Sequence, residues 1–245
     1  MKHAERFYRD YTETPRWHSY RVKVETTDLY IKTREDHSDQ ARAFVQEARD
    51  LLRRQIALDG SFLTSLTPVT RPPSPHRLVE RMYAASESAG VGPMAAVAGA
   101  VAEYVGARLR AMSPEVVVEN GGDIWLHIGE PVVLALFAGR SAFDGLQLMV
   151  RPEKTPLGIA TSSGRIGPSL SFGRADAACV IAADAALADA VATGAGNLIN
   201  DESGMEAAAR YAMGIDGVLG VVLAYGDRLL LQGDLELAPP RRKAG

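Results

Sequence analysis

The sequence contains a single cysteine, Cys179, and this scarcity excludes a disulfide framework within the chain. Cys179 lies in an apolar run, residues 177–182, where a buried and unreactive side chain is expected. Neither sign of charge is in excess, since 27 lysines and arginines stand against 30 aspartates and glutamates. A chain with this balance predicts neither nucleic acid nor an anionic membrane as a partner.

Long apolar segments are also missing. The longest uncharged apolar stretch lies between Glu87 and Glu103, too short and too rich in glycine and alanine to cross a bilayer. Residues 1–15 alternate charged and aromatic side chains, so they do not resemble a secretory signal. We therefore expect a cytoplasmic protein, and 47% hydrophobic residues in a chain of 245 are enough for a large core.

Several catalytic motifs are absent. The sequence has no Cys-x-x-Cys pair, no His-Glu-x-x-His, no phosphate loop ending in Gly-Lys-Ser/Thr and no Gly-x-Ser-x-Gly elbow. The five histidines lack metal-ligand spacing, which argues against a structural zinc site. His127, in an alternating segment, is either an isolated base or a packed strand side chain.

Periodicity predicts an α+β fold with mixed, mostly antiparallel sheets and packed helices. No linker divides the chain, so we expect one domain over residues 1–237 and a disordered tail over 238–245. The predicted hairpins are 18–33, 116–128 and 219–231, the further strands 132–137, 146–150 and 177–182, and the helices 39–58, 75–88, 93–112, 185–199 and 205–213.

Two glycine-containing turns are candidate ligand sites. Gly92, at a predicted helix start, would offer backbone amides to a phosphate or carboxylate, or would form a tight turn between helices. The second turn consists of Asn120, Gly121, Gly122 and Asp123, between two alternating segments. Its glycines would allow a ligand to approach closely, although the same sequence is a good hairpin turn.

A third candidate is a glycine- and serine-rich span, residues 158–173, which we expect to form a loop. Thr161, Ser162 and Ser163 place three successive hydroxyl groups between glycines. Together with backbone amides they would bind an oxyanion or a nucleotide, or they would belong to a plain turn.

The fourth candidate is the pair Asp189 and Thr193. These residues are four positions apart in a predicted helix, so their side chains share one face. A carboxylate and a hydroxyl oxygen suit Mg²⁺, although such pairs are also common on exposed helices. The surrounding residues, 185–188, are apolar, which gives Asp189 little reason to be there for solubility.

In chain order these segments resemble the ApbE-like superfamily, whose Mg²⁺-dependent members transfer FMN from FAD to a threonine of a target protein. The resemblance covers residues 90–197 and is most specific in CVIAADAALADAVATG, which begins at Cys179. It implies that Asp189 and Thr193 hold Mg²⁺. It also implies that residues 119–123 match the Gly-Gly-Asn/Asp turn of that superfamily and that residues 158–164 lie near a flavin or its phosphates.

The sequence departs from the flavin transferases at two points. Ala98 stands where they carry a lysine, and their His-x-x-Asp-Pro segment has no counterpart before Ala177. A closer resemblance, through GPMAAVAGAVAEYV and ENGGDIWL, is to a compact sister family of anaerobic bacteria and archaea. That family is linked to sulfur assimilation, in particular homocysteine formation, beside other proteins.

The resemblance therefore implies three alternative functions. The first is a protein that binds a nucleotide-like or phosphorylated ligand, such as a flavin, together with Mg²⁺. The second is a non-catalytic accessory or assembly partner that kept the fold. The third, an FAD:protein FMN transferase, is weakened by the two departures. A protein partner is expected in the second case, and the small-residue helix over residues 92–106 would serve either internal packing or a homodimer.

Overall fold

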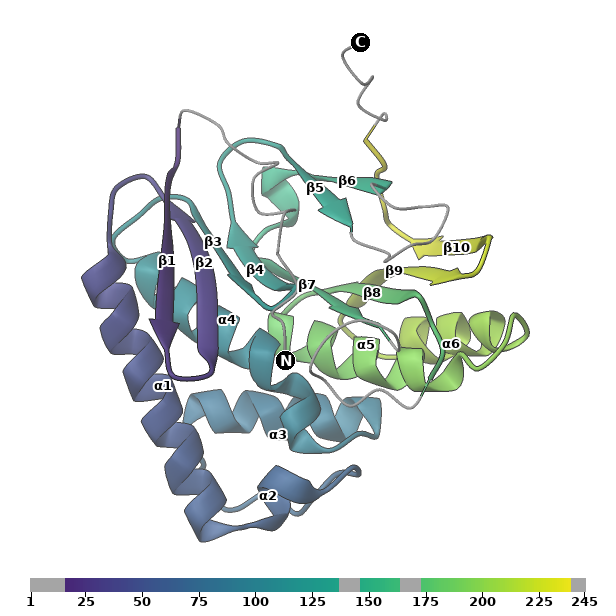
Figure 1. Cartoon of the computed structure of the whole chain (residues 1–245), viewed down its shortest axis with the longest axis horizontal. Coiled ribbons are helices and arrows are strands. Elements are labelled where there is room, and N and C mark those ends of the chain that lie inside the picture. Colours follow the sequence, from purple (N-terminus) through teal and green to yellow (C-terminus); the bar gives the residue numbers. More distant parts are fainter. Residues whose placement is uncertain (1–15, 137–145, 164–172, 239–245) are drawn as a thin grey trace.

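The computed structural model describes residues 16–136, 146–163 and 173–238. Its centre is an eight-stranded antiparallel sheet with the order β1-β2-β3-β4-β7-β8-β9-β10 (Figure 1). The strands of this sheet are β1 (His18–Val24), β2 (Thr27–Thr33), β3 (Val116–Asn120), β4 (Asp123–His127), β7 (Leu157–Ser162), β8 (Ala177–Ala182), β9 (Val218–Tyr225) and β10 (Arg228–Gly233). The predicted α+β class with antiparallel sheets is confirmed.

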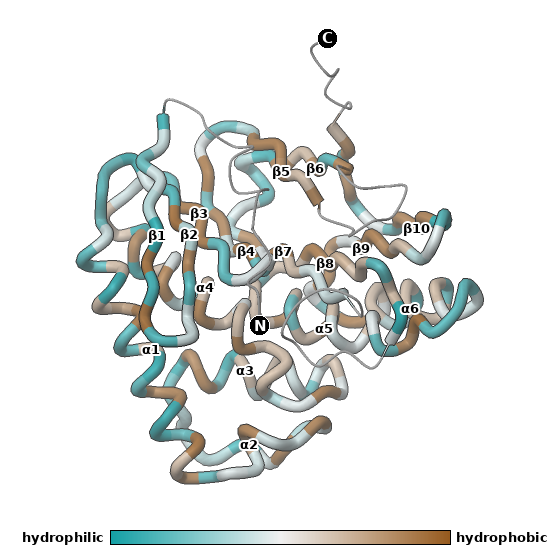
Figure 2. Tube along the Cα trace, viewed as in Figure 1, coloured by the Kyte–Doolittle hydropathy of each residue, from teal (hydrophilic) through white to brown (hydrophobic). Residues whose placement is uncertain are grey.

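The described α-helices all lie on one side of this sheet (Figure 1). They are α1 (Ser38–Leu58), α2 (Ser61–Thr64), α3 (Arg77–Ala89), α4 (Val97–Leu109), α5 (Ala185–Leu198) and α6 (Gly204–Met213), with short 3-10 turns η2 (Pro93–Ala96) and η3 (Pro152–Lys154). Of these, α2 and α3 pack against other helices. Figure 2 shows hydrophilic residues along the outer helix α1 and apolar residues on the central strands. Among the described residues, none of these helices combines the length and apolarity needed to span a bilayer.

Local chemistry explains where α3 begins. The prediction that it starts at Pro75 was wrong, because Ser74 adopts a left-handed conformation with φ 50°. His76 caps the helix instead, and its Nδ1 accepts a hydrogen bond of 3.2 Å from the amide of Leu78. Gly90 ends the helix in the left-handed conformation that favours glycine.

Small residues let α4 and α5 approach their neighbours closely. A Cβ atom added to Gly106 would lie 2.2 Å from the Trp125 ring of β4. One added to Gly99 would lie 2.0 Å from the carbonyl oxygen of Ala185 at the start of α5. The small-residue face of α4 therefore serves internal packing.

The expected loop over residues 158–173 was wrong in its first part, because Gly158–Ser162 belongs to the central strand β7. A Cβ atom at Gly158 would lie 2.2 Å from the Cα of Ala185. The glycine is thus required by the helix that crosses the strand and does not mark a turn. Residues 164–172 of the expected loop lie outside the described residues.

The other face of the sheet is covered by a separate two-stranded ribbon, β5 (Val132–Leu136) and β6 (Leu146–Val150) (Figure 1). Ribbon and sheet enclose a second apolar core that contains Cys179, which is 2% exposed. Burial raises the pKa of this thiol to about 11, in agreement with the predicted unreactive role. Arg151 and Glu236 form two hydrogen bonds of 2.6 Å that hold the C-terminal segment beside β6.

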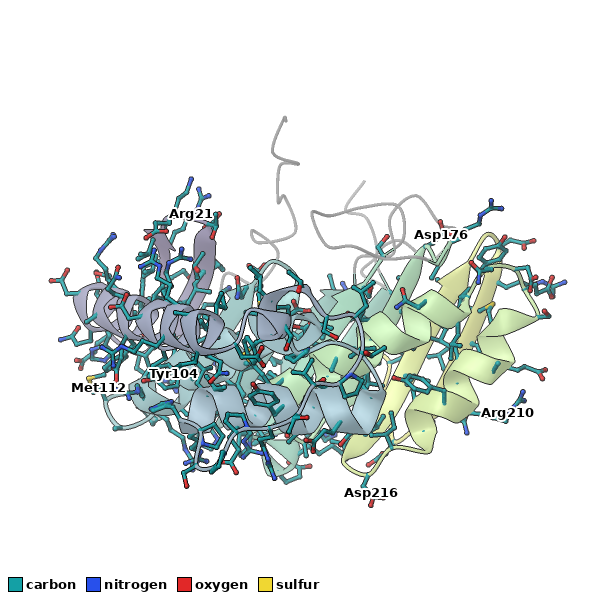
Figure 3. The ribbon with its side chains drawn as sticks, turned by 90° about the horizontal axis from the view of Figure 1, so that it is seen from below. Arg21, Tyr104, Met112, Asp176, Arg210 and Asp216 are labelled. Carbon is teal, nitrogen blue, oxygen red and sulfur yellow. The ribbon has the colours of Figure 1, made fainter. Side chains whose placement is uncertain are left out.

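The antiparallel register defines two ends of the main sheet. The Asn120 end carries the last residue of β3 and the first of β4, together with the last residue of β7, Ser162. The Glu115 end is the other end of the sheet, where β3 begins and β4 ends. Figure 3 shows Arg21 and Asp176, from the Asn120 end, at one margin of the molecule and Asp216 at the opposite margin.

Candidate functional site

The site is built around Asp189, which lies near the middle of α5 and faces the beginning of α4. Its Oδ2 atom accepts a hydrogen bond of 2.9 Å from the backbone amide of Gly99. Amides in the first turn of a helix have no partner within that helix, and the helix dipole favours a negative charge there. Asp189 therefore caps α4 from a different element.

Electrostatics at Asp189 are dominated by burial. Burial raises the pKa of this carboxyl group to about 7, although hydrogen bonds from the amides of Gly99 and Ala98 act in the opposite direction. An aspartate with this pKa takes up a proton near neutral pH unless a positive charge replaces that proton. The group is thus suited to exchange a proton for a cation.

Asp123, the first residue of β4, supplies a second carboxylate beside Asp189. Burial raises its pKa well above the ordinary value, and the charges of Asp189 and Glu119 raise it further. A hydrogen bond from the backbone of Thr161 on β7 opposes this effect. Among the described residues, no cationic group contributes to the pKa shift of either aspartate.

The turn that presents Asp123 is held by its own side chains. Its central residues are Gly121 and Gly122, with φ of 72° and 116°, so two glycines satisfy the positive φ of a tight hairpin. Glu119 accepts a hydrogen bond of 3.0 Å from the amide of Gly122. Asn120 and Asp123 face each other as paired strand residues.

Asn120 connects this turn to α4. Its Nδ2 atom donates a hydrogen bond of 3.0 Å to the carbonyl oxygen of Ala98. One N–H of the Asn120 amide is therefore used within the protein, which gives this residue a positioning role beside the predicted ligand contact.

Thr193 and Ser162 extend the site along α5. Thr193 lies one helical turn beyond Asp189 and is partly exposed. Ser162 approaches the same face of the helix further on, since a Cβ atom added to Gly196 would lie 3.4 Å from its Oγ. Asp189, Thr193 and Ser162 thus follow one another where α5 packs against the end of β7.

The other predicted hydroxyl groups lie differently. Thr161 and Ser162 alternate on β7, so their side chains point to opposite faces of the sheet. The Thr161 side chain hydrogen-bonds the thiol of Cys179 on the ribbon side. The backbone of Thr161 forms a hydrogen bond with Asp123. Ser163 follows the end of the strand and is partly exposed.

Gly92 is placed away from this arrangement. It is buried, and a Cβ atom added to it would lie 1.8 Å from the carbonyl oxygen of Ser65. Its close approach is therefore to the connection before α3. Among the described hydrogen bonds, those that build the carboxylate pair do not involve it.

His127 is the last residue of β4 and lies at the Glu115 end, whereas Asp123 is the first residue of the same strand. Burial lowers its pKa, the charge of Arg110 lowers it further, and Glu115 raises it. The histidine is therefore separate from the carboxylate pair, and this favours the packed strand side chain over the isolated base.

Sequence reasoning missed the backbone of Ala98 and Gly99 as part of the site. The available signal was a run of small residues at a helix start, where first-turn amides lack partners. The sequence also predicted Asp123 as a ligand-binding residue and not as part of the metal site with Asp189 and Thr193. Residues 123 and 189 are far apart in the chain, so their proximity could not be inferred.

The arrangement provides hard oxygen ligands with a net negative charge. The described residues contain no group of three or more histidine, cysteine, aspartate or glutamate side chains that could hold a metal ion. Mg²⁺ is commonly bound by one or two carboxylates, waters and the phosphates of its substrate, so a two-carboxylate site fits this ion.

The architecture matches known folds. The Pseudomonas stutzeri flavinyl transferase ApbE superposes with a TM-score of 0.52 at 14% identity, covering 89% of this chain and 94% of that one. The flavin transferase ApbE from Vibrio cholerae gives 0.51 at 14% identity, covering 89% and 96%. The chain therefore has the fold of the ApbE-like proteins.

Sequence relatives define its place more closely. The family described as "AbpE bacteria" matches residues 9–220. A UPF0280 protein of Methanocella arvoryzae is 43% identical over 192 residues, 78% of each chain. One of Methanothrix thermoacetophila is 37% identical over 222 residues, 90% of this chain and 92% of that protein. The chain belongs to the UPF0280 family. The ApbE-like superfamily that its sequence motifs predicted is confirmed.

Proposed function

We propose that this protein binds a nucleotide-like or phosphorylated ligand through Mg²⁺ at the Asn120 end of the sheet. The observation that carries the proposal is the pair of neighbouring carboxylates, Asp123 and Asp189, on which no described cationic group acts. Both residues are partly buried, and charges withdrawn from water are normally paired or hold a metal ion. A divalent cation supplies the missing positive charge.

Asp189 and Thr193 would hold the ion, with Asp123 as the second carboxylate. Bound there, Mg²⁺ would neutralise phosphate charge and fix the orientation of the ligand. The amides of Ala98 and Gly99 hold Asp189. The hydroxyl groups of Ser162 and Ser163 would donate hydrogen bonds to the ligand from the end of β7.

A flavin nucleotide is the first ligand to test, because the structural neighbours are named flavin transferases. A role in sulfur assimilation, which the sequence resemblance implies, would use this ligand site. Cys179 is unsuited to carry sulfur, since its thiol is buried and its pKa is raised to about 11.

The second candidate function is that of a non-catalytic accessory protein. It is favoured by Ala98, which stands beside Asp189 where the flavin transferases carry a lysine. The Ala98 carbonyl oxygen is bound by Asn120, and the adjoining Gly99 has no space for a side chain. Robust turnover by the isolated protein would exclude this function, and isolation with one stoichiometric partner would favour it.

The proposal is tested by isothermal titration with FAD, FMN, ADP and ATP, each with and without Mg²⁺. We expect binding of at least one nucleotide to depend on Mg²⁺ and to be lost in Asp189→Ala. Asp216→Ala is the matched control, because Asp216 is exposed at the opposite end of the sheet (Figure 3). Equal affinity in the wild type and in Asp189→Ala would contradict the assignment.

A further inference from the structure

One peptide unit lies between Asn120 and Asp189. The carbonyl oxygen of Ala98 and the amide nitrogen of Gly99 belong to the same peptide bond. Asn120 donates to the oxygen at 3.0 Å, and Asp189 accepts from the nitrogen at 2.9 Å. Because a peptide unit is planar, fixing its oxygen also fixes the direction of its N–H group.

The chain leaves this peptide unit little freedom to shift. A Cβ atom added to Gly99 would lie 2.0 Å from the carbonyl oxygen of Ala185 and 2.9 Å from the Cβ of Asp189. Helices α4 and α5 therefore touch through their backbones at this point. The Asn120 side chain braces the same unit from the sheet, so helix and sheet together set the orientation of the Asp189 carboxylate.

We infer that Asn120 is a positioning residue that makes the Asp189 site selective for a small divalent cation. This inference rests on the proposed function, since it concerns the cation of that same site. Mg²⁺ requires near-ideal octahedral geometry at short distances, whereas Ca²⁺ accepts more ligands in flexible arrangements. A carboxylate that is held rigidly favours the ion with the stricter geometry.

This role differs from a direct ligand contact. One N–H of the Asn120 amide donates to Ala98, and this hydrogen bond connects Asn120 to Asp189 through the peptide unit. Groups that orient a metal ligand commonly change metal affinity about tenfold or more when they are removed. Loss of the Asn120 hydrogen bond should therefore lower the affinity for Mg²⁺ more than the affinity for Ca²⁺.

The test is calorimetric titration of the full chain with MgCl₂ and CaCl₂ for the wild type and Asn120→Ala. We expect Mg²⁺ affinity to fall about tenfold and Ca²⁺ affinity to change about twofold or less. Asn200→Ala, a substitution of an exposed asparagine, is the matched control and should leave both affinities unchanged. Asn120→Thr, which keeps a strand-forming residue, replaces the alanine variant if that variant does not fold.

The outcomes separate the two ideas. An equal loss of affinity for both cations, or no loss for either, would overturn the positioning role while the proposed function stands. Failure of the wild type to bind either cation would overturn the inference, whereas the nucleotide titrations with and without Mg²⁺ test the proposed function separately. A selective loss of Mg²⁺ affinity supports both.

Discussion

The two ends of the main sheet differ in how their carboxylates are compensated: Glu115 is buried, whereas Asp123 and Asp189 are partly buried. At the Glu115 end, Glu115 is 2% exposed and accepts from the amide of Gly129 at 2.7 Å. Arg34 approaches it at 2.7 Å and Arg16 at 3.5 Å. At the Asn120 end, Asp123 and Asp189 repel each other, and backbone amides are their described donors.

The difference teaches how to separate a structural charge from a functional one. A carboxylate with arginine partners and a backbone donor stabilises the fold as it stands. A pair without a counter-charge costs stability and is retained where a ligand supplies the missing charge. Glu103 is intermediate, because it accepts from the amide of Ala185 and faces Arg81, yet burial and the charge of Asp184 raise its pKa.

The largest expected effect comes from removing the compensated carboxylate. Glu115→Ala should lower the free energy of unfolding by about 3 kcal/mol, because two arginines and an amide lose their partner. Urea unfolding monitored by circular dichroism measures this loss. Glu130→Ala is the control, since Glu130 also pairs with Arg16 but its side chain is 66% exposed. Similar losses in both variants would remove the contrast between the two ends.

A smaller effect of opposite sign is expected for Asp189→Asn. In the absence of divalent cations at pH 8, this variant should gain on the order of 1 kcal/mol in unfolding free energy. The asparagine keeps an oxygen for the amide of Gly99 and removes the repulsion with Asp123. Urea unfolding in EDTA measures the change. A loss of stability would mean that a positive partner already compensates the aspartate.

The smallest effect is a dependence on pH. The pKa of Asp189 is raised from 3.8 to about 7, so the folded state binds a proton more tightly than the unfolded chain. Stability without metal should therefore fall as pH rises through this window. The advantage of Asp189→Asn over the wild type should grow from pH 5 to pH 8 in thermal unfolding. Parallel curves would contradict the raised pKa.

Much of the fold could be predicted because it depends on local pattern. The hairpin over residues 18–33 was correct since Val22, Leu29 and Ile31 alternate toward the helices. The strand at Gly158 could not be recognised from the sequence. Its glycine is needed because Ala185, on a helix that comes later in the chain, packs directly against it.

The site divides in the same way. The placement of Asp189 and Thr193 on one helix face follows from their spacing, so it could be predicted from the sequence. The approach of Asp123 to Asp189, and the peptide unit between Asn120 and Asp189, require strands and helices to be packed first. Such contacts between distant segments leave no periodic signal in one sequence.

The buried position of Cys179 also makes the natural chain a convenient background for chemical labelling. Thiol reagents attack the thiolate, and this thiol is 2% exposed with a pKa of about 11. A cysteine introduced at an exposed residue such as Ser203 would then react alone under native conditions. A fluorophore placed there could report on ligand binding at α5 without any substitution of the native thiol.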